Sequence, residues 1–185
     1  EQAEAAASLA QAIGGGFDPV LLDGVTGSGK TEVYFEAIAE CLRTGKQALV
    51  LLPEIALTEP FLKRFEARFG CEPVAWHSDL RSSQRRRNWR GIATGEAKVT
   101  VGARSALFLP YPDLGLIVVD EAHEASFKQE DGVQYHARDV AVMRAKFQDV
   151  PVILSSATPA IESRHMVEIG RYREVTLARR FAGAS

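Results

Sequence analysis

Two short polar segments contain the residue types that nucleotide chemistry needs, and the first is rich in glycine. It reads Gly24-Val25-Thr26-Gly27-Ser28-Gly29-Lys30-Thr31 and lies between an apolar run and a helical pattern. Gly27 and Gly29 let the backbone turn so that successive N–H groups point at phosphate oxygens, and the next helix adds the positive end of its dipole. Lys30 supplies a charge for the β- and γ-phosphates, and the Thr31 hydroxyl is a ligand for Mg²⁺. All eight residues are therefore predicted to bind ATP in a P-loop.

The second polar segment is Asp120-Glu121-Ala122-His123, directly after an apolar run. Asp120 is expected to hold Mg²⁺ opposite Thr31, and Glu121 to polarise the water that attacks the γ-phosphate. Adjacent carboxylates indicate water as the nucleophile, whereas a small-molecule kinase activates a hydroxyl of its substrate. The alternative is that the two acids only cap and charge the first turn of the next helix.

Length and composition fit one compact α/β domain. The chain has 185 residues, 46% of them hydrophobic, and a formal net charge of −2, so any basic patch must be local. Cys41 and Cys71 are too isolated to indicate zinc or a disulfide framework, which favours a reducing compartment such as the cytoplasm. No apolar run reaches about 18 residues, so no membrane partner is expected. The chain begins without methionine and ends just after an expected strand, which suggests a fragment of a longer protein.

Apolar runs alternate with helical patterns along the chain. Strands are expected at residues 20–23, 47–52, 73–76, 98–101, 114–119, 151–154 and 174–177. Helices are expected at residues 1–13, 31–42, 58–69 (capped by Thr58), from 82 or 83 onward, 137–147 and 159–169. This order predicts a central, mostly parallel sheet covered by helices on both faces, in three layers. In such a sheet the ligand lies beyond the carboxyl ends of the strands, where residues 24–31 and Asp120 both fall.

The second polar segment also carries a family resemblance. Asp120-Glu121-Ala122-His123 resembles the DEAH-type box of superfamily-two helicases, although many of those proteins have an acidic residue where Ala122 stands. Ser156-Ala157-Thr158 resembles their third motif, which implies that His123, Ser156 and Thr158 couple the nucleotide state to the grip on nucleic acid. A narrower resemblance, to the replication-restart (primosomal) helicases, extends over residues 24–34, 52–58, 102–108, 135–139 and 156–163.

This resemblance implies that residues 1–185 are a single RecA-like lobe, the first motor lobe of a 3′-to-5′ DNA helicase that restarts stalled replication forks. It implies ATP and Mg²⁺ as cofactors, and forked or single-stranded DNA, a second motor lobe and replication-restart proteins as partners. The family's N-terminal DNA-binding region, zinc-binding cysteines and second lobe have no counterpart in the chain. Because an arginine finger from a second lobe contributes a factor of about 10³–10⁵, the chain is expected to bind nucleotide but to hydrolyse it slowly.

The resemblance also points to DNA contacts in loops that follow strands. These are Pro53-Glu54-Ile55 and residues 102–105, where Arg104 can bind a phosphate in bidentate fashion and Ser105 can donate a hydroxyl. The alternative is a surface arginine beside a helix-capping serine. His77-Ser78 also follows a strand and is a weaker candidate. Gln2 stands where related helicases place a glutamine that binds adenine; otherwise it is an exposed residue on an alanine-rich helix.

Residues 125–138 resemble an aromatic-rich loop that links single-stranded DNA to the ATP site in this family. Phe127 could stack on a base and Lys128 pair with a phosphate, while Arg138 and Asp139 could brace the loop by an ion pair. The alternative is that Phe127 and Tyr135 are core residues beneath a polar loop.

The run from Arg81 to Arg90 is strongly basic and contains Trp89. We expect it to be a solvated helix face with Trp89 in the core, with nucleic-acid binding as the alternative.

Three rival functions stay open. A P-loop kinase would need an acceptor pocket and a mobile arginine-bearing lid, for which the sequence gives no sign. A nucleotide-gated DNA-binding switch without unwinding would use the same residues. Another superfamily-two translocase, such as a branch-migrating helicase or a restriction-enzyme motor, is the nearest alternative.

Overall fold

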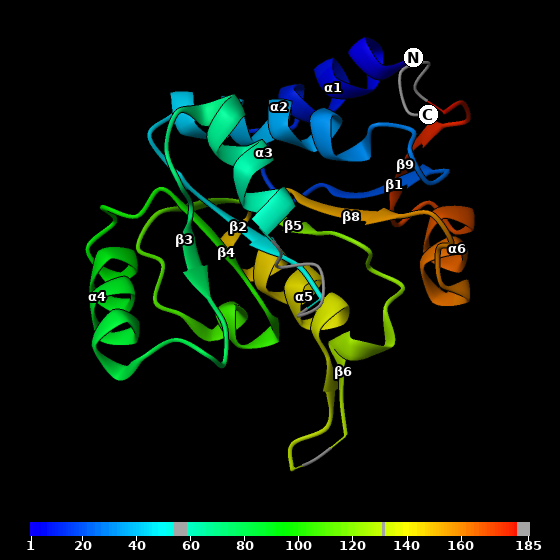
Figure 1. The fold of residues 1–185 in the computed structure, drawn as a ribbon. Helices are drawn as coiled ribbons and strands as arrows, with labels where there is room; N and C mark the ends of the chain where they lie inside the picture. The colour runs from blue at the N-terminus through cyan, green and yellow to red at the C-terminus, as the bar shows by residue number, and fades with distance from the viewer. Residues whose placement is uncertain (54–58, 131, 181–185) are drawn as a thin grey trace.

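The computed structural model describes residues 1–53, 59–130 and 132–180. Seven strands form one sheet in the order β3-β4-β2-β5-β8-β1-β9, and every neighbouring pair is parallel (Figure 1). The strands are β1 (Pro19–Gly24), β2 (Gln47–Leu51), β3 (Val74–Trp76), β4 (Val99–Gly102), β5 (Leu114–Val119), β8 (Val152–Ser156) and β9 (Arg173–Leu177). A separate antiparallel pair, β6 (Lys128–Gln129) and β7 (Tyr135–His136), projects from the body of the molecule.

Six α-helices and two 3₁₀ turns connect the described strands. The helices are α1 (Gln2–Gln11), α2 (Lys30–Arg43), α3 (Glu59–Phe69), α4 (Ser82–Ala93), α5 (Ala137–Gln148) and α6 (Ile161–Glu168), and the 3₁₀ turns are η2 (Arg104–Phe108) and η3 (Ala125–Phe127). Figure 1 shows α1, α2 and α3 on one face of the sheet, α5 on the other, and α4 beside the edge strand β3.

The sheet is apolar on both faces, and successive side chains of a strand enter different cores. Leu116 and Val118 of β5 pack with the helices α1, α2 and α3. Ile117 and Val119 face the opposite core, which is closed by α4, η2 and α5. Because the side chains of a strand alternate between its faces, a strand covered on both sides reads as a continuous apolar run. This is why the runs in the sequence identified the strands.

An aromatic cluster fixes α3 against α2. Phe35 of α2 is fully buried, and its ring makes edge-to-face contacts with Phe61, Phe65 and Phe69 at centroid separations of 5.4–6.0 Å. These three residues recur at helical spacing on one side of α3, as its amphipathic pattern predicts. Thr58, expected to cap this helix, lies outside the described residues.

The predicted three-layer fold is confirmed, with corrections in detail. Each expected strand and helix is present, with ends that differ by a few residues; α6, for example, begins at Ile161 rather than at Pro159. The β6–β7 pair and the two 3₁₀ turns were not predicted. The placement of Trp89 in the core was wrong, since 49% of its surface is exposed. Among the described residues, no helix combines the length and the apolarity that crossing a bilayer requires.

Replacement of Phe35 tests the aromatic cluster. Phe35→Ala is expected to lower the free energy of unfolding by about 3–5 kcal/mol, because it leaves a cavity among three rings. Phe147→Ala, at a position that is 82% exposed, is the control and should change stability by less than about 0.5 kcal/mol. Urea denaturation measures both; similar losses in the two variants would contradict this account of the core.

Candidate nucleotide and DNA site

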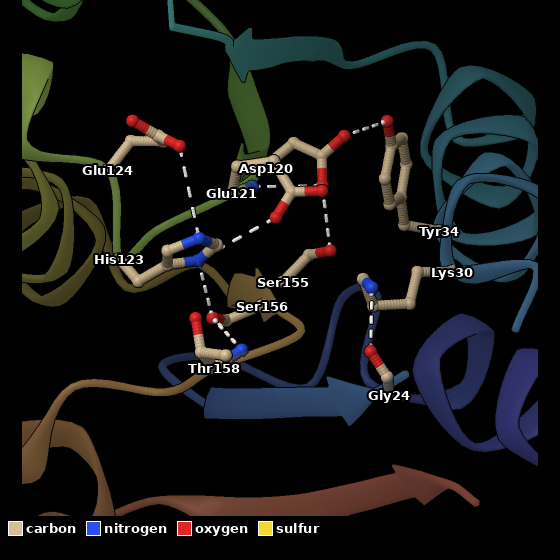
Figure 2. Close-up of polar contacts among 10 residues, drawn as sticks. All are labelled: Gly24, Lys30, Tyr34, Asp120, Glu121, His123, Glu124, Ser155, Ser156 and Thr158. Atoms are coloured by element: carbon tan, nitrogen blue, oxygen red, sulfur yellow. Dashed lines mark hydrogen bonds and ion pairs between the residues drawn. The ribbon is translucent and has the colours of Figure 1, made fainter. Parts of the chain in front are cut away.

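Three strands that are neighbours in the sheet end beside one another and carry the predicted nucleotide residues. β1 leads into the glycine-rich segment, β5 into Asp120-Glu121, and β8 ends at Ser156. Figure 2 shows Lys30, Asp120, Glu121, His123 and their partners grouped at this edge. The parallel topology therefore brings together segments that are far apart in the sequence.

The glycine-rich segment has the shape of a phosphate-binding loop. Gly27 and Gly29 have φ angles of 79° and 87°, which are favourable for glycine, and α2 begins immediately afterwards at Lys30. A Cβ atom on Gly24 would lie 2.6 Å from Ser28 Oγ, so the turn has no room for a side chain there. Lys30 is buried, and its Nζ donates to the Gly24 carbonyl at 2.7 Å, which holds the ammonium group against the loop (Figure 2).

Gln2 reaches this loop from α1. Its Nε2 donates to the Ser28 carbonyl at 2.6 Å. The predicted adenine-binding glutamine is therefore adjacent to the phosphate loop, although its role toward a base remains a prediction.

Asp120 is the most heavily constrained carboxylate of the site. Its Oδ2 accepts from the Tyr34 hydroxyl at 2.9 Å, and its Oδ1 accepts from Ser155 Oγ at 2.7 Å and from the Glu121 N–H at 3.0 Å. Tyr34 is completely buried, and this burial, reinforced by the charge of Asp120, holds its pKa well above the usual value. The tyrosine hydroxyl therefore stays protonated at physiological pH and donates a hydrogen bond to Asp120.

Tyr34 and Ser155 were not predicted from the sequence as residues of the site. Tyr34 lies one helical turn after Lys30, and Ser155 is the first of two serines that end an otherwise apolar strand. Both were visible as polar groups in buried elements, which usually require a partner. Their shared partner could not be read from the sequence, because Asp120 is 86 and 35 residues away, respectively.

The oxygen groups around Asp120 fit a magnesium ion. Thr31 is the second residue of α2, and Tyr34, which donates to Asp120, lies three residues later on the same helix. Mg²⁺ prefers oxygen ligands and is usually bound through one or two carboxylates together with substrate phosphates. Thr31 and Asp120 are the residues that would hold it.

Glu121 combines a strained backbone with a perturbed carboxyl group. Its φ of 47° is unusual for a residue other than glycine, and such strain is often concentrated at functional sites. Partial burial raises the pKa of its carboxyl, and the negative charge of Asp120 raises it further, while Lys30 and His123 act in the opposite direction. A raised pKa suits a group that must accept a proton near neutral pH.

His123 joins this carboxylate to the end of β8. Its Nδ1 lies 2.8 Å from Ser156 Oγ and 3.6 Å from Glu121 Oε2 (Figure 2). Ser156 Oγ also accepts from the Thr158 N–H at 3.1 Å. The three predicted coupling residues are thus connected, and Thr158 is exposed at the end of the chain of contacts.

Four of the predicted DNA contacts line one small cavity. Its volume is about 180 Å³, and the four residues are Pro53, Arg104, Phe127 and Lys128. Arg104 Nη1 donates to the Lys128 carbonyl at 2.8 Å, so the loop after β4 is bonded to β6. Ser105 is exposed. Glu54 and Ile55, predicted beside Pro53, lie outside the described residues.

The structure places Phe127 in the core, where only 1% of its surface is exposed. Its ring offers no face to a base, which favours the alternative that it is a core residue. Tyr135 is half-buried, with its ring edge-to-face against Phe108 at 5.5 Å. Arg138 Nε pairs with Asp139 Oδ1 at 2.9 Å, which confirms the expected ion pair.

The class of protein follows from comparison with known families. Residues 2–167 match the family model described as DEAD/DEAH box helicase. The chain belongs to this family.

Within it, the chain is similar to replication restart protein PriA. It is 52% identical over 163 residues to that protein from Rickettsia conorii, and 47% identical over 160 residues to that from Bacillus subtilis. These alignments cover 88% and 86% of the chain but only 25% and 20% of the two relatives.

Solved helicase structures share the fold at low sequence identity. The helicase MrfA bound to DNA and AMPPNP matches 97% of the chain with a TM-score of 0.68 at 16% identity, over 26% of its own length. RecG bound to a three-way DNA junction matches 98% of the chain with a TM-score of 0.67 at 21% identity, over 24% of its own length. These likenesses confirm the RecA-like architecture.

The titration of Glu121 can be measured directly. By carboxyl ¹³C NMR without nucleotide, Glu121 is expected to titrate above an ordinary glutamate, and Asp120→Asn should lower its midpoint by removing a negative charge. Glu130, whose pKa is lowered by Lys128, is the internal reference. Since burial penalises only the charged form, the folded protein gains stability as the pH falls through the Glu121 midpoint. A midpoint at or below that of Glu130 would contradict the assignment.

Replacement of Tyr34 tests the support of Asp120. Tyr34→Phe should lower the free energy of unfolding by about 1–3 kcal/mol, because it removes a donor to a buried carboxylate, and should weaken the binding of Mg²⁺-ATP. The control is Tyr111→Phe, which removes a buried hydrogen bond to the Ala106 carbonyl away from this site. It should cost stability without changing nucleotide affinity, as calorimetry would show. Equal nucleotide affinities in the two variants would refute the role of Tyr34.

Proposed function

We propose that this chain is the ATP-binding motor lobe of a DNA helicase that restarts stalled replication forks. The observation that carries the proposal is the meeting of the phosphate loop with Asp120-Glu121, at a sheet edge shared with the Arg104–Lys128 contact. A nucleotide site and a surface that carries Arg104 and Lys128, at one edge of the sheet, are what a motor needs in order to link ATP hydrolysis to DNA. The similarity to PriA supplies the biological setting.

In this mechanism the loop of residues 24–31 wraps the phosphates of ATP with its backbone N–H groups. Lys30 exchanges its bond with the Gly24 carbonyl for the β- and γ-phosphate oxygens. Glu121 orients a water molecule toward the γ-phosphate and accepts its proton as the new P–O bond forms and ADP leaves. Mg²⁺, held by Thr31 and Asp120, supplies charge neutralisation for the phosphates when bound.

The contacts of His123 couple the state of the nucleotide to the end of β8. Loss of the γ-phosphate changes the charge that faces Glu121, and His123 touches both Glu121 and Ser156. A shift of this histidine therefore alters the end of β8 and the exposed Thr158. In the whole protein, Thr158 would face a second motor lobe.

The direction of movement, the form of DNA, the protein partners and the site of action are proposed from the similarity to PriA. We include in the proposal 3′-to-5′ movement, binding to forked or single-stranded DNA, replication-restart proteins as partners, and a site of action in the cytoplasm. Slow turnover by the chain alone also belongs to it, since an arginine finger from a second lobe supplies much of the rate in related motors. A nucleotide-gated DNA-binding switch is the second candidate, because the Arg104–Lys128 contact would serve it equally well.

Phosphate release from ATP is the decisive measurement. The chain should bind Mg²⁺-ATP and release phosphate slowly to water, and Glu121→Gln should reduce this release by about 10²–10⁴-fold while nucleotide binding persists. Glu66→Gln, at an exposed position on α3, is the matched control and should behave as wild type. Phosphate transfer to an acceptor would indicate a kinase. Turnover unaffected by Glu121→Gln would contradict the proposed mechanism.

A further inference from the structure

A groove between β3 and α4 lies outside the nucleotide site, and its lining includes Ser78, the weaker DNA-contact candidate, and part of the basic run from Arg81 to Arg90. It has a volume of about 470 Å³. Its lining includes two tryptophans, two arginines and two serines: Trp76, Trp89, Arg85, Arg86, Ser78 and Ser82. Trp76 and Trp89 are the only tryptophans of the chain, so both of its largest aromatic side chains face this one groove.

The groove has a rigid floor. Trp76 is 9% exposed, and the Arg85 guanidinium lies over its ring at 5.5 Å. Arg85 Nη2 also donates to the carbonyls of His77 and Ser78, each at 3.2 Å. Asn88 Nδ2 donates to the Ala75 carbonyl at 2.9 Å, and Ile92 is fully buried, so α4 is fixed against β3. These contacts leave Arg86 and Trp89 on the open side.

The open side is cationic and aromatic. The helix α4 contains four arginines and no acidic residue, although the whole chain has a formal net charge of −2. By contrast, Arg64 and Arg68 of α3 pair with Glu32 and Glu36. The arginines of α4 form no salt bridge within residues 1–53, 59–130 and 132–180, and they surround an aromatic ring that is 49% exposed. Proteins hold single-stranded nucleic acid with this combination, because phosphates bind the cations and bases stack on the rings.

The groove and the proposed DNA surface lie on neighbouring strands of the sheet. Trp76 pairs with Gly102 across β3 and β4, and the Ala103 N–H donates to the Trp76 carbonyl at 3.1 Å. Arg104 follows directly. A Cβ atom on Gly102 would lie 2.6 Å from the Trp76 carbonyl oxygen, so β3 and β4 pack closely two residues before Arg104.

From this geometry we infer that the β3–α4 groove is a second binding site for single-stranded DNA, in which Trp89 stacks on a base and Arg86 binds a phosphate. The inference rests on the proposed function, because it extends the DNA surface beyond Arg104 to the edge of the sheet. Arg85 acts as a positioning residue that holds the Trp76 floor.

Anisotropy of a labelled oligo(dT) tests the site in the 185-residue chain. Trp89→Ala should weaken binding about tenfold, as expected for the loss of one stacked base, and Trp89→Phe should restore most of the affinity. Arg86→Ala should weaken binding and reduce the slope of log affinity against log salt by about 0.7, the value for one phosphate contact in a single strand. Arg87→Ala is the matched control, since it removes the same charge from the same helix outside the groove lining.

The binding data distinguish a failure of the groove hypothesis from a failure of the proposed function. If Trp89→Ala and Arg86→Ala bind no more weakly than Arg87→Ala, while Arg104→Ala binds poorly, the groove is not a DNA site and the proposed motor stands. If Trp89→Ala, Arg86→Ala and Arg104→Ala all bind DNA as wild type does, the groove site and the DNA surface of the proposed function are both wrong. Inorganic polyphosphate serves as a probe without bases. An equal effect of Trp89→Ala on polyphosphate and on oligo(dT) would overturn the stacking.

Discussion

The hydrogen bonds to the Asp120 carboxylate are the constraint on which the site depends. A buried carboxylate is costly unless its oxygens are bonded, and here the donors come from three elements: Tyr34 of α2, Ser155 of β8 and the Glu121 backbone. Since α2 begins within the phosphate loop, these bonds fix the distance between the loop and the carboxylate that would share a metal ion with it. They also anchor the peptide of Glu121, whose left-handed backbone directs its side chain.

The strands, the phosphate loop and the Asp120-Glu121 pair were predictable from the sequence, because burial and local chemistry dictate their residue types. Strands buried on both faces need apolar residues at most positions, so β2, β5 and β8 are visible as runs. The phosphate loop and the Asp120-Glu121 pair are local in sequence, because their chemistry requires adjacent residues. Parallel topology then requires their ends to meet at one edge.

What escaped prediction depends on long-range contacts. No local pattern reveals that Tyr34 and Ser155 share one carboxylate. Trp89 was misplaced because the inward positions of α4 are taken by Asn88 and Ile92, one helical turn apart, which turns the tryptophan toward the groove. Phe127 was ambiguous for the opposite reason, since a short 3₁₀ turn gives no periodicity from which to infer burial.

The position of β1 in the sheet has a consequence for the order of assembly. This strand, made from residues 19–24, pairs with β8 and β9, whose residues lie more than 125 positions later in the chain. Such pairings carry a large loop-closure entropy and form slowly. During synthesis, the phosphate loop emerges before β8 and β9 and stays without these neighbouring strands until they follow. A product truncated before β8 would therefore leave β1, and the phosphate loop that follows it, without both of its neighbouring strands.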